Sequence, residues 1–503
     1  MKLPIPRDLL LLTLALMVCI FLTALDVTVV GIAMPTIIGS LGGLELYSWV
    51  FAAYLLTGTI GVPIYGKLAD LYGRKPVFMA GAGLFLLGSV LCGIAQSMEQ
   101  LILFRAIQGL GSGAVFPITM TIIGDVFTLE QRARVQGVFS SVWGVSSVVG
   151  PAVGGFITDH ASWRWIFYLN LPTGLAAMAL LGWTFRERVE HRRHRIDWPG
   201  AVLLAMGITA LLLAFMQTGG SSGTPALTAG MLACAALSTA AFIWQERRAP
   251  EPLLPLELFR SRLIAASSLG AFFVGAALFG SSSFVPPFVQ GVLGQSATAT
   301  GLPLIAHSVA WSLGSVIGGR IIIRTGYRLA SVLGGLAIAG GILGLAVLTE
   351  QSSLWLVAAT MVPIGIGMGF CSLAFLLSVQ NAVDWNQRGV ITSSNQFFRS
   401  IGGTIGVSLV GAVFNARLGP ELASLPGGSA VDPDALLEPA ARAMLPPELL
   451  PDLALALQRA LQSAYVTSLL LALAVIGAAC LLPGGRAAEH AWSPSSEAGV
   501  EPV

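Results

Sequence analysis

Four ionisable side chains lie inside long apolar stretches of the sequence: Asp26, Arg105, His307 and Arg399. A charged side chain in hydrocarbon costs from about 3 to more than 10 kcal/mol, so such residues are functional candidates by default. Asp26 is the only acid deep in one of these stretches. Its chemistry suits a group that exchanges a proton for a cationic molecule. The alternative is an acid that packs helices together while bound to Arg105 or Thr28.

Helix geometry gives the depth of each of these side chains in the membrane. Asp26 lies about 25 Å along a stretch that starts near residue 9, and Arg105 lies about 6 Å into a stretch that starts on the opposite side. Both therefore fall in the same half of a bilayer, where they can pair. Arg399 is expected to bind backbone carbonyls rather than a substrate. His307 is either a neutral packing residue or a proton-linked group in a cavity.

The composition defines the elements that must position these residues. Of 503 residues, 55% are hydrophobic and 10% are charged, and the mean hydropathy is +0.80. Soluble proteins have about 25% charged residues, so a cytosolic enzyme, a nucleic-acid-binding protein and a disordered scaffold are excluded. A membrane-spanning helix needs about 20 apolar residues. Fourteen stretches qualify: 9–31, 47–66, 76–96, 101–124, 136–158, 163–184, 198–217, 226–245, 263–286, 298–320, 329–349, 354–381, 391–415 and 461–482.

Basic residues predict the orientation of these spans. With a cytoplasmic N-terminus, 21 of the 27 Lys and Arg residues fall on the inner side and four on the outer side. This bias is typical of membrane proteins and places both termini in the cytoplasm. The basic segment 186–195 is expected to be a cytoplasmic stop signal near anionic lipid rather than a dedicated binding site. The end of the outer segment 417–459 has the pattern of an amphipathic helix lying on the outer surface.

Several other functions lack their sequence signals. The five cysteines are scattered through apolar stretches without a CxxC pair, which favours packing over a disulfide framework or a metal site. The first span has no cleavage site and is expected to be retained. No GxxxxGK[ST] loop for ATP is present. We therefore expect no metal, no cofactor and no enzymatic activity.

The two ends of the chain contain related patterns. Gly109, Gly111 and Gly113 recur 256 residues later as Gly365, Gly367 and Gly369, and the pair Gly66 and Gly73 recurs 253 residues later as Gly319 and Gly326. Internal repeats are characteristic of secondary transporters. The predicted architecture is a six-helix bundle (1–185), a basic linker with two additional spans (186–257), a second six-helix bundle with the outer loop 417–459 (258–482), and a cytoplasmic tail, expected to be disordered (483–503).

Five segments together carry a resemblance to a known family. The loop 66–75 (GKLADLYGRK) resembles the signature loop of the major facilitator superfamily. Segments 25–35 (LDVTVVGIAMP), 101–109 (LILFRAIQG), 150–155 (GPAVGG) and 163–174 (WRWIFYLNLPTG) resemble its fourteen-span drug:proton antiporter branch (QacA/EmrB-like). The chain departs from that branch at Gly31, where Asn is usual, and at Ile323, which stands where the first loop copy has Asp70.

The resemblance implies roles for several groups of residues. It implies that Arg105 takes part in proton coupling, the alternative being a residue that snorkels to the outer interface, and that a loop between spans 2 and 3 acts as a conformational switch. The residues of that loop place Asp70 to cap the next helix or to pair with a base across the bundle interface. That loop contributes Gly66, Asp70, Gly73, Arg74 and Lys75. The resemblance links the fifth span to antiport through Gly150, Pro151, Gly154 and Gly155. An aromatic cavity for flat cations has as candidates Trp49, Tyr54, Phe139, Trp143 and Trp311.

The sequence thus predicts a proton-coupled multidrug efflux antiporter in the plasma (inner) membrane. It would export lipophilic, mainly cationic compounds by alternating access. An exporter of a lipid, siderophore or metabolite on the same fold is the alternative. The expected partners are small lipophilic substrates, protons and membrane lipids, with no nucleic acid, and the protein is expected to act as a monomer.

Overall fold

The computed structural model describes residues 7–126, 149–185, 197–219, 225–250, 256–383, 388–425 and 449–486, together with 142, 145–146, 187 and 252–254. Regular structure in these residues is entirely helical. Thirteen segments are long and apolar enough to cross a membrane. The fifth predicted span, 136–158, lies partly outside the described residues, and its portion 149–158 belongs to a helix that continues to residue 160. The all-α multi-pass architecture is therefore confirmed.

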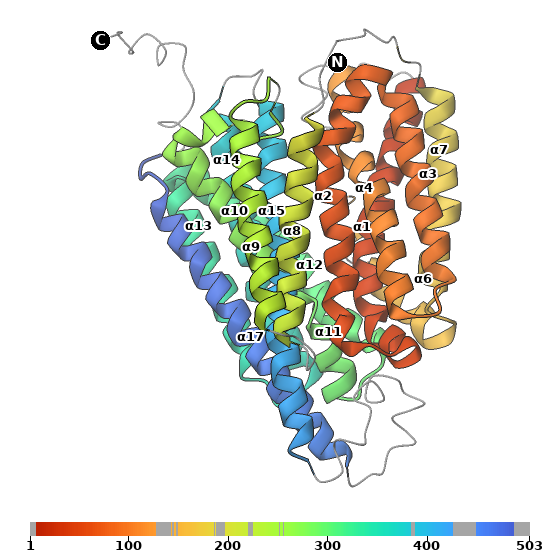
Figure 1. Cartoon of the computed structure of the whole chain (residues 1–503), viewed down its shortest axis with the longest axis vertical. Coiled ribbons are helices and arrows are strands. Elements are labelled where there is room, and N and C mark those ends of the chain that lie inside the picture. The colour runs from red at the N-terminus through yellow and green to blue at the C-terminus, as the bar shows by residue number, and fades with distance from the viewer. Residues whose placement is uncertain are drawn as a thin grey trace.

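The first bundle contains the first third of the chain (Figure 1). Within it α4 packs against α2 and α3, and α1 packs against α7. The predicted sixth span is divided at Leu169 into two helices. The elements are α1 (Arg7–Leu41), η1 (Leu44–Leu46), α2 (Tyr47–Tyr72), α3 (Arg74–Gly93), α4 (Met98–Val126), α6 (Trp165–Tyr168) and α7 (Asn170–Thr184).

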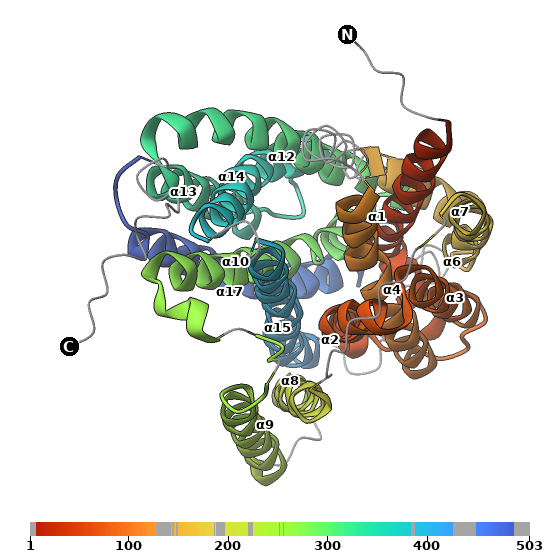
Figure 2. The same ribbon diagram turned by 90° about the horizontal axis from the view of Figure 1, so that it is seen from above.

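The second bundle lies beside the first (Figure 2). In it α14 packs against α12 and α13, while α10, α15 and α17 pack against one another. A short helix and a π-helical turn connect α10 to α12. The elements are η2 (Leu256–Arg260), α10 (Arg262–Ser282), α11 (Val285–Pro287), η3 (Phe288–Val292), α12 (Ala297–Thr325), α13 (Tyr327–Ala346), α14 (Leu354–Asn381), α15 (Arg388–Ala423) and α17 (Leu450–Leu481).

The sequence repeat corresponds to a repeat of helices. The helices α3 and α13 are both 20 residues long and start 253 residues apart, at Arg74 and Tyr327. Each follows a glycine with positive φ, Gly73 at 96° and Gly326 at 92°. The turn after α13 (347–353) is three residues longer than the turn after α3 (94–97). This difference explains why the sequence offset changes from 253 to 256 at α4 and α14.

The repeated glycines allow the helices of each bundle to approach closely. A Cβ on Gly111 would lie 2.2 Å from the backbone nitrogen of Phe85 in α3, and one on Gly367 would lie 2.3 Å from the carbonyl oxygen of Gly334 in α13. The neighbouring glycines of each triplet contact α2 in the first bundle and α12 in the second. Small residues at such contacts are typical of membrane helix pairs. The two bundles thus use the same residues for the same contacts.

Two further helices lie outside both bundles. They are α8 (Trp198–Gly219) and α9 (Pro225–Glu246), which pack against each other. The helix α8 also contacts α15 and α2, so it lies along the boundary between the bundles, with α9 outermost (Figure 2). Their bounds agree with the predicted stretches 198–217 and 226–245.

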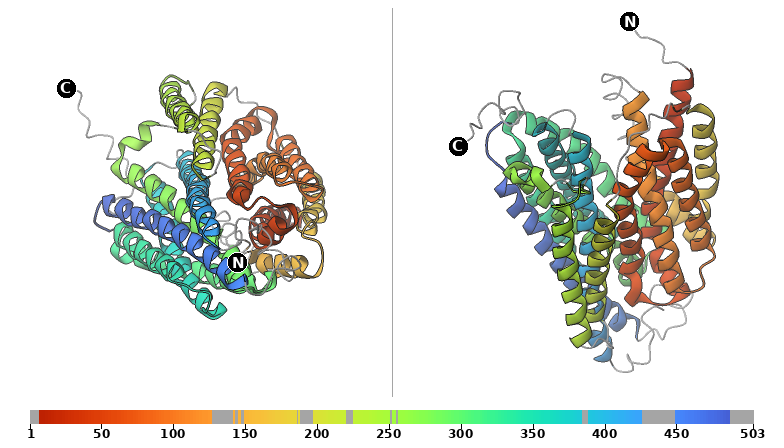
Figure 3. Two further views of the ribbon diagram at one scale, coloured as in Figure 1. Left: turned by 60° about the horizontal axis from the view of Figure 1, so that its bottom comes forward. Right: turned by 45° about the horizontal axis from the view of Figure 1, so that its top comes forward.

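The bundles are joined at one end of the molecule, which we call the closed end. It is formed by the last turns of α1 and of segment 149–160, the first turns of α2 and α12, and the connection α11–η3. There Gln290 Nε2 donates to the Ile32 carbonyl (3.0 Å), Asn415 Nδ2 donates to the Glu45 carbonyl (2.7 Å), and the Tyr47 hydroxyl donates to the Ser283 carbonyl. The bundles diverge toward the opposite end, where α1 begins and α17 ends (Figure 3).

One surface element differs from its prediction. The segment expected as an amphipathic helix on the outer surface is instead the first part of α17, which starts at Leu450. Its residues Leu453, Leu457 and Leu461 are at most 1% exposed. Gln458 Oε1 accepts a hydrogen bond from the Glu350 backbone (2.7 Å). The apolar stripe is therefore covered by protein, because it packs on the turn between α13 and α14.

Candidate functional site

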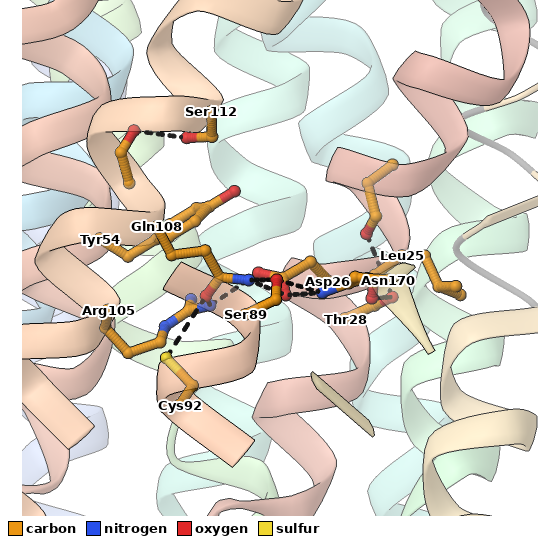
Figure 4. A network of polar contacts seen from close by, with 12 residues as sticks. Leu25, Asp26, Thr28, Tyr54, Ser89, Cys92, Arg105, Gln108, Ser112 and Asn170 are labelled. Carbon is orange, nitrogen blue, oxygen red and sulfur yellow. Dashed lines mark hydrogen bonds and ion pairs between the residues drawn. The ribbon is translucent and has the colours of Figure 1, made fainter. Parts of the chain in front are cut away.

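The centre of the first bundle contains a buried ion pair. A guanidinium nitrogen of Arg105 in α4 donates to Asp26 Oδ2 in α1 over 2.7 Å (Figure 4). The side chains are each 1% exposed. The two residues, which the sequence places in the same half of the bilayer, are thus in direct contact. Thr28, the other suggested partner of Asp26, instead donates to the carbonyls of Ala24 and Leu25.

Two amides complete the coordination of the Asp26 carboxylate. Gln108 Nε2 in α4 and Asn170 Nδ2 in α7 both donate to Asp26 Oδ1, each over 2.8 Å. Both amides also donate to the Ser89 hydroxyl in α3, over 2.8 and 3.2 Å. Removing one partner of a buried pair generally costs about 3–5 kcal/mol. The network therefore ties together four helices of the first bundle.

Sequence reasoning did not assign roles to Gln108, Asn170 or Ser89. Gln108 and Asn170 lie in segments 101–109 and 163–174, which carry the family resemblance. The available signal was an amide inside an apolar stretch. Such a group must find partners when it is buried, and here Gln108, Asn170 and Ser89 are at most 1% exposed.

The Arg105 guanidinium has contacts beyond Asp26. It also donates to Gln108 Oε1 (2.6 Å), and its Cζ lies 4.0 Å from the centre of the Tyr54 ring in α2. A cation over an aromatic face is stabilised by the ring quadrupole. Arg105 therefore keeps two favourable contacts that do not depend on Asp26.

Three of the five candidates for the predicted aromatic cavity lie in the described residues. Tyr54 is 5% exposed and packs on Arg105 inside the first bundle. Trp49 and Trp311 are partly buried against the main core. Phe139 and Trp143 lie outside the described residues. The aromatic cavity therefore stays a prediction.

The two remaining charged candidates lie in the second bundle, apart from the ion pair. His307 in α12 is 6% exposed, and its ring centre lies 5.8 Å from that of Trp311. The backbone of Met361 lies nearby, but neither ring nitrogen has a partner in hydrogen-bond geometry. Arg399 is half-buried in α15. In the described part of the chain no hydrogen bond or ion pair of its guanidinium is found, so its bonds to backbone carbonyls stay a prediction.

The predicted switch loop is mostly helical. The helix α2 continues through Gly66 and Asp70 to Tyr72, and only Gly73 separates it from α3. Asp70 therefore cannot be the N-cap of α3, and its side chain lies outside what the structure describes. The turn is tight because Gly73 has the positive φ that glycine adopts most readily.

Glu187, to which the sequence analysis assigned no role, binds the first backbone N–H groups of α3. Its carboxylate accepts from the backbone nitrogens of Arg74 (2.7 Å) and Lys75 (3.0 Å), and lies 3.8 Å from the Arg74 guanidinium. In return, Lys75 Nζ donates to the carbonyls of Gly182 (2.6 Å) and Phe185 (3.0 Å) at the end of α7. Acids at helix N-termini and bases at C-termini are favourable. The signature residues Arg74 and Lys75 thus join α3 to α7.

The glycines of the fifth span make contacts in both bundles. A Cβ on Gly150 would lie 2.1 Å from Thr28 Oγ1 in α1, and one on Gly155 would lie 2.5 Å from Thr298 Cα in α12. Gly154 contacts Val29 of α1. A Cβ on Gly301 of α12 would lie 3.4 Å from the carbonyl oxygen of Pro151. These small residues therefore allow close contact at the closed end.

The position where the chain departs from the family pattern is open. A Cβ on Gly31 would meet nothing within 4 Å. The asparagine usual in the resembling branch would therefore meet no clash at its Cβ. Within the described residues, the absence of that side chain leaves free space beside α1.

Two repeated helical bundles that meet at one end, with a buried charge pair inside the first of them, are typical of a membrane transporter rather than an enzyme. The family model for the Major Facilitator Superfamily matches residues 16–407. The chain belongs to this superfamily, and its substrates are small molecules.

Relatives and solved structures agree with this assignment. The chain is 41% identical to Multidrug transporter protein MdtP of Bacillus subtilis over 83% of its length and 79% of that protein. It is 36% identical to Multidrug resistance protein 3 of the same organism over 94% of each chain. The fold is similar to a bacterial homologue of the human lysosomal transporter Spinster in an inward-facing, unoccupied conformation, with TM-score 0.66, 19% identity and coverage of 97% and 99%.

Proposed function

We propose that the protein is a proton-coupled exporter of lipophilic, mainly cationic compounds, and that it works in the plasma membrane with both termini in the cytoplasm. The observation that carries the proposal is the buried Asp26–Arg105 ion pair at the centre of the first bundle. The names of the two Bacillus relatives support drug efflux. The distribution of basic residues supports the orientation.

In the proposed mechanism the carboxylate of Asp26 exchanges Arg105 for a proton. When Asp26 is neutralised, Arg105 retains Gln108 Oε1 and the Tyr54 ring as partners. The first bundle then carries one more positive charge, which disfavours a cationic substrate nearby. Proton entry and cation exit are therefore alternatives. Exchange of one proton for one monovalent cation moves no net charge, so the pH gradient drives it, and each pH unit, worth about 1.4 kcal/mol, supports about a tenfold substrate gradient.

The proposed orientation assigns a conformational state to the structure. With cytoplasmic termini, the closed end faces the outside and the diverging ends of the bundles face the cytoplasm (Figure 3). The molecule is then inward-facing. Asp26 is 2% exposed in this state, so we expect proton exchange to require further motion of α1 against α4.

The deciding experiment is ethidium export from proteoliposomes under an imposed pH gradient. We expect Asp26→Asn to abolish gradient-driven export. The matched control is Asp197→Asn, which changes another buried acid that caps α8 through the Gly200 N–H (3.1 Å). The control should export like the wild type, because the substituted amide can still cap the helix.

Two other outcomes have distinct meanings. If Asp26→Asn exports normally, Asp26 is a packing residue and the coupling assignment is wrong. If the wild type does not export ethidium but does export a lipid, siderophore or metabolite under the same gradient, the substrate class changes and the transporter assignment stands.

A further inference from the structure

A carboxylate at the closed end connects the two bundles. Asp159 belongs to the last turn of the helical segment 149–160. Its Oδ1 accepts from the backbone nitrogen of Ala297 over 3.0 Å, and its Oδ2 accepts from that of Thr298 over 2.8 Å. Ala297 and Thr298 are the first two residues of α12 in the second bundle. One side chain thus makes two hydrogen bonds between the bundles.

Asp159 completes the N-terminus of α12. The first N–H groups of a helix have no partners within the helix. Here Ser296 Oγ accepts from the Ala299 backbone over 3.1 Å, which leaves the two preceding donors to Asp159. The negative charge also faces the positive end of a 29-residue helix, where an anion is favoured.

Within its own helix Asp159 has an unfavourable position. An acid in a last turn lies near the negative end of the helix dipole and opposes it. The side chain is exposed to solvent, so burial does not require an acid there. Its favourable interactions with protein therefore come from α12, and they exist only while the bundles are joined at this end.

Neighbouring contacts bring the two helices close enough for these bonds. A Cβ on Gly155, one turn before Asp159, would lie 2.5 Å from Thr298 Cα. Further hydrogen bonds between the bundles come from the neutral side chains of Tyr47, Gln290 and Asn415. Among these four residues, Asp159 is the charged one.

We propose that Asp159 is a latch that holds the closed end shut by capping α12 from the opposite bundle, and that this contact must break each time the closed end opens. The proposal rests on the alternating-access mechanism of the proposed function. It requires no knowledge of which side of the membrane the closed end faces. Asp159 is a positioning residue, because it acts on the arrangement of the bundles and not on substrate or proton.

The test measures the opening of the closed end directly. Double electron–electron resonance measures the distance between two spin labels, one at Gln96 and one at Gln351. These are exposed turn residues of the two bundles at this end. The accessible Cys234 and Cys480 are first replaced by serine. We expect Asp159→Ala to increase the ratio of open to closed molecules about tenfold.

Asp159→Asn should give a smaller increase of about threefold, because an amide has one accepting oxygen instead of two. The control is Glu421→Gln. This acid pairs with Arg459 over 3.0 Å, within the second bundle. Its removal should leave the ratio unchanged, because the pair does not cross between the bundles.

A second variant removes a donor in place of the acceptor. Thr298→Pro deletes one of the two N–H groups, and the first turn of a helix tolerates proline. We expect a shift of about threefold alone and no further shift when Thr298→Pro is added to Asp159→Ala. An unchanged ratio in Asp159→Ala, or fully additive shifts, would overturn the latch. Because the ratio is measured without substrate, a failure of ethidium export would count against the proposed function only.

Discussion

At the scale of single residues, the first bundle places a full negative charge and a full positive charge in the membrane interior with every Asp26 oxygen bound. The pair has no net charge, but removal of either partner leaves the other as an unpaired buried charge, which lowers the stability of the protein. Thermal stability and transport should therefore respond differently to single and double substitutions of Asp26 and Arg105.

We expect Asp26→Asn and Arg105→Gln each to reduce the free energy of unfolding by about 3 kcal/mol, because each leaves one uncompensated buried charge. The double variant should recover most of this loss, while gradient-driven export remains absent. Thermal unfolding in detergent and export assays on the same preparations measure both effects. Full recovery of export in the double variant would show that charge exchange at this pair is not required.

At the scale of helices, contacts depend on glycines that the sequence repeats. Gly111 and Gly83 lie on the adjacent helices α4 and α3 but have opposite surroundings. A Cβ on Gly111 would lie 2.2 Å from a backbone atom, whereas a Cβ on Gly83 would meet nothing within 4 Å. A glycine-to-alanine substitution is therefore predicted to change the stability of the protein in opposite directions at the two positions.

Gly111→Ala should destabilise the protein by at least about 2 kcal/mol, because α3 and α4 must separate. Gly83→Ala should be neutral or stabilising by up to about 1 kcal/mol, since alanine favours helix. Gly367→Ala, at the related position of α14, should behave like Gly111→Ala. Thermal melts of the three variants test the set; similar melting temperatures for Gly111→Ala and Gly83→Ala would contradict the packing argument.

The helices themselves were predictable because apolar length and turn residues are local signals. The predicted span 354–381 coincides with α14, whereas α17 starts eleven residues before its predicted boundary of 461. The partners of the helix ends were not predictable. Glu187 binds α3, and Asp159 binds α12 from the other bundle. Both are isolated acids in sequence, and only the three-dimensional arrangement of helices brings them to those N–H groups.

At the scale of the whole molecule, the two bundles share a framework but not its polar residues. The repeat offsets relate Tyr54 to His307 and Arg105 to Met361. They also relate Ser89 to Ile342 and Gln108 to Ile364, and Met361, Ile342 and Ile364 are each 0% exposed. The second bundle therefore has apolar residues where the first has its charge network. Tyr54 packs on the Arg105 guanidinium, whereas His307 has Met361 at the related position.

This asymmetry makes a prediction for His307. His307→Phe should raise the melting temperature, because it removes two buried nitrogens that lack hydrogen-bond partners. Gradient-driven export should persist at half the wild-type rate or more. The repeat-related Tyr54→Leu removes the aromatic face below Arg105 and should reduce export several-fold. Loss of export in a well-folded His307→Phe protein would instead assign His307 a part in transport.

The open space beside Gly31 has a consequence for how such a protein changes under selection. Replacing a helical glycine usually gains about 0.5–1 kcal/mol, and a new side chain here begins in empty space. A single base change can therefore alter the surface of α1 at this position without a folding penalty. We expect populations exposed to a new toxic compound to acquire substitutions at Gly31 early, before they acquire changes at the tightly packed glycines of the fifth span.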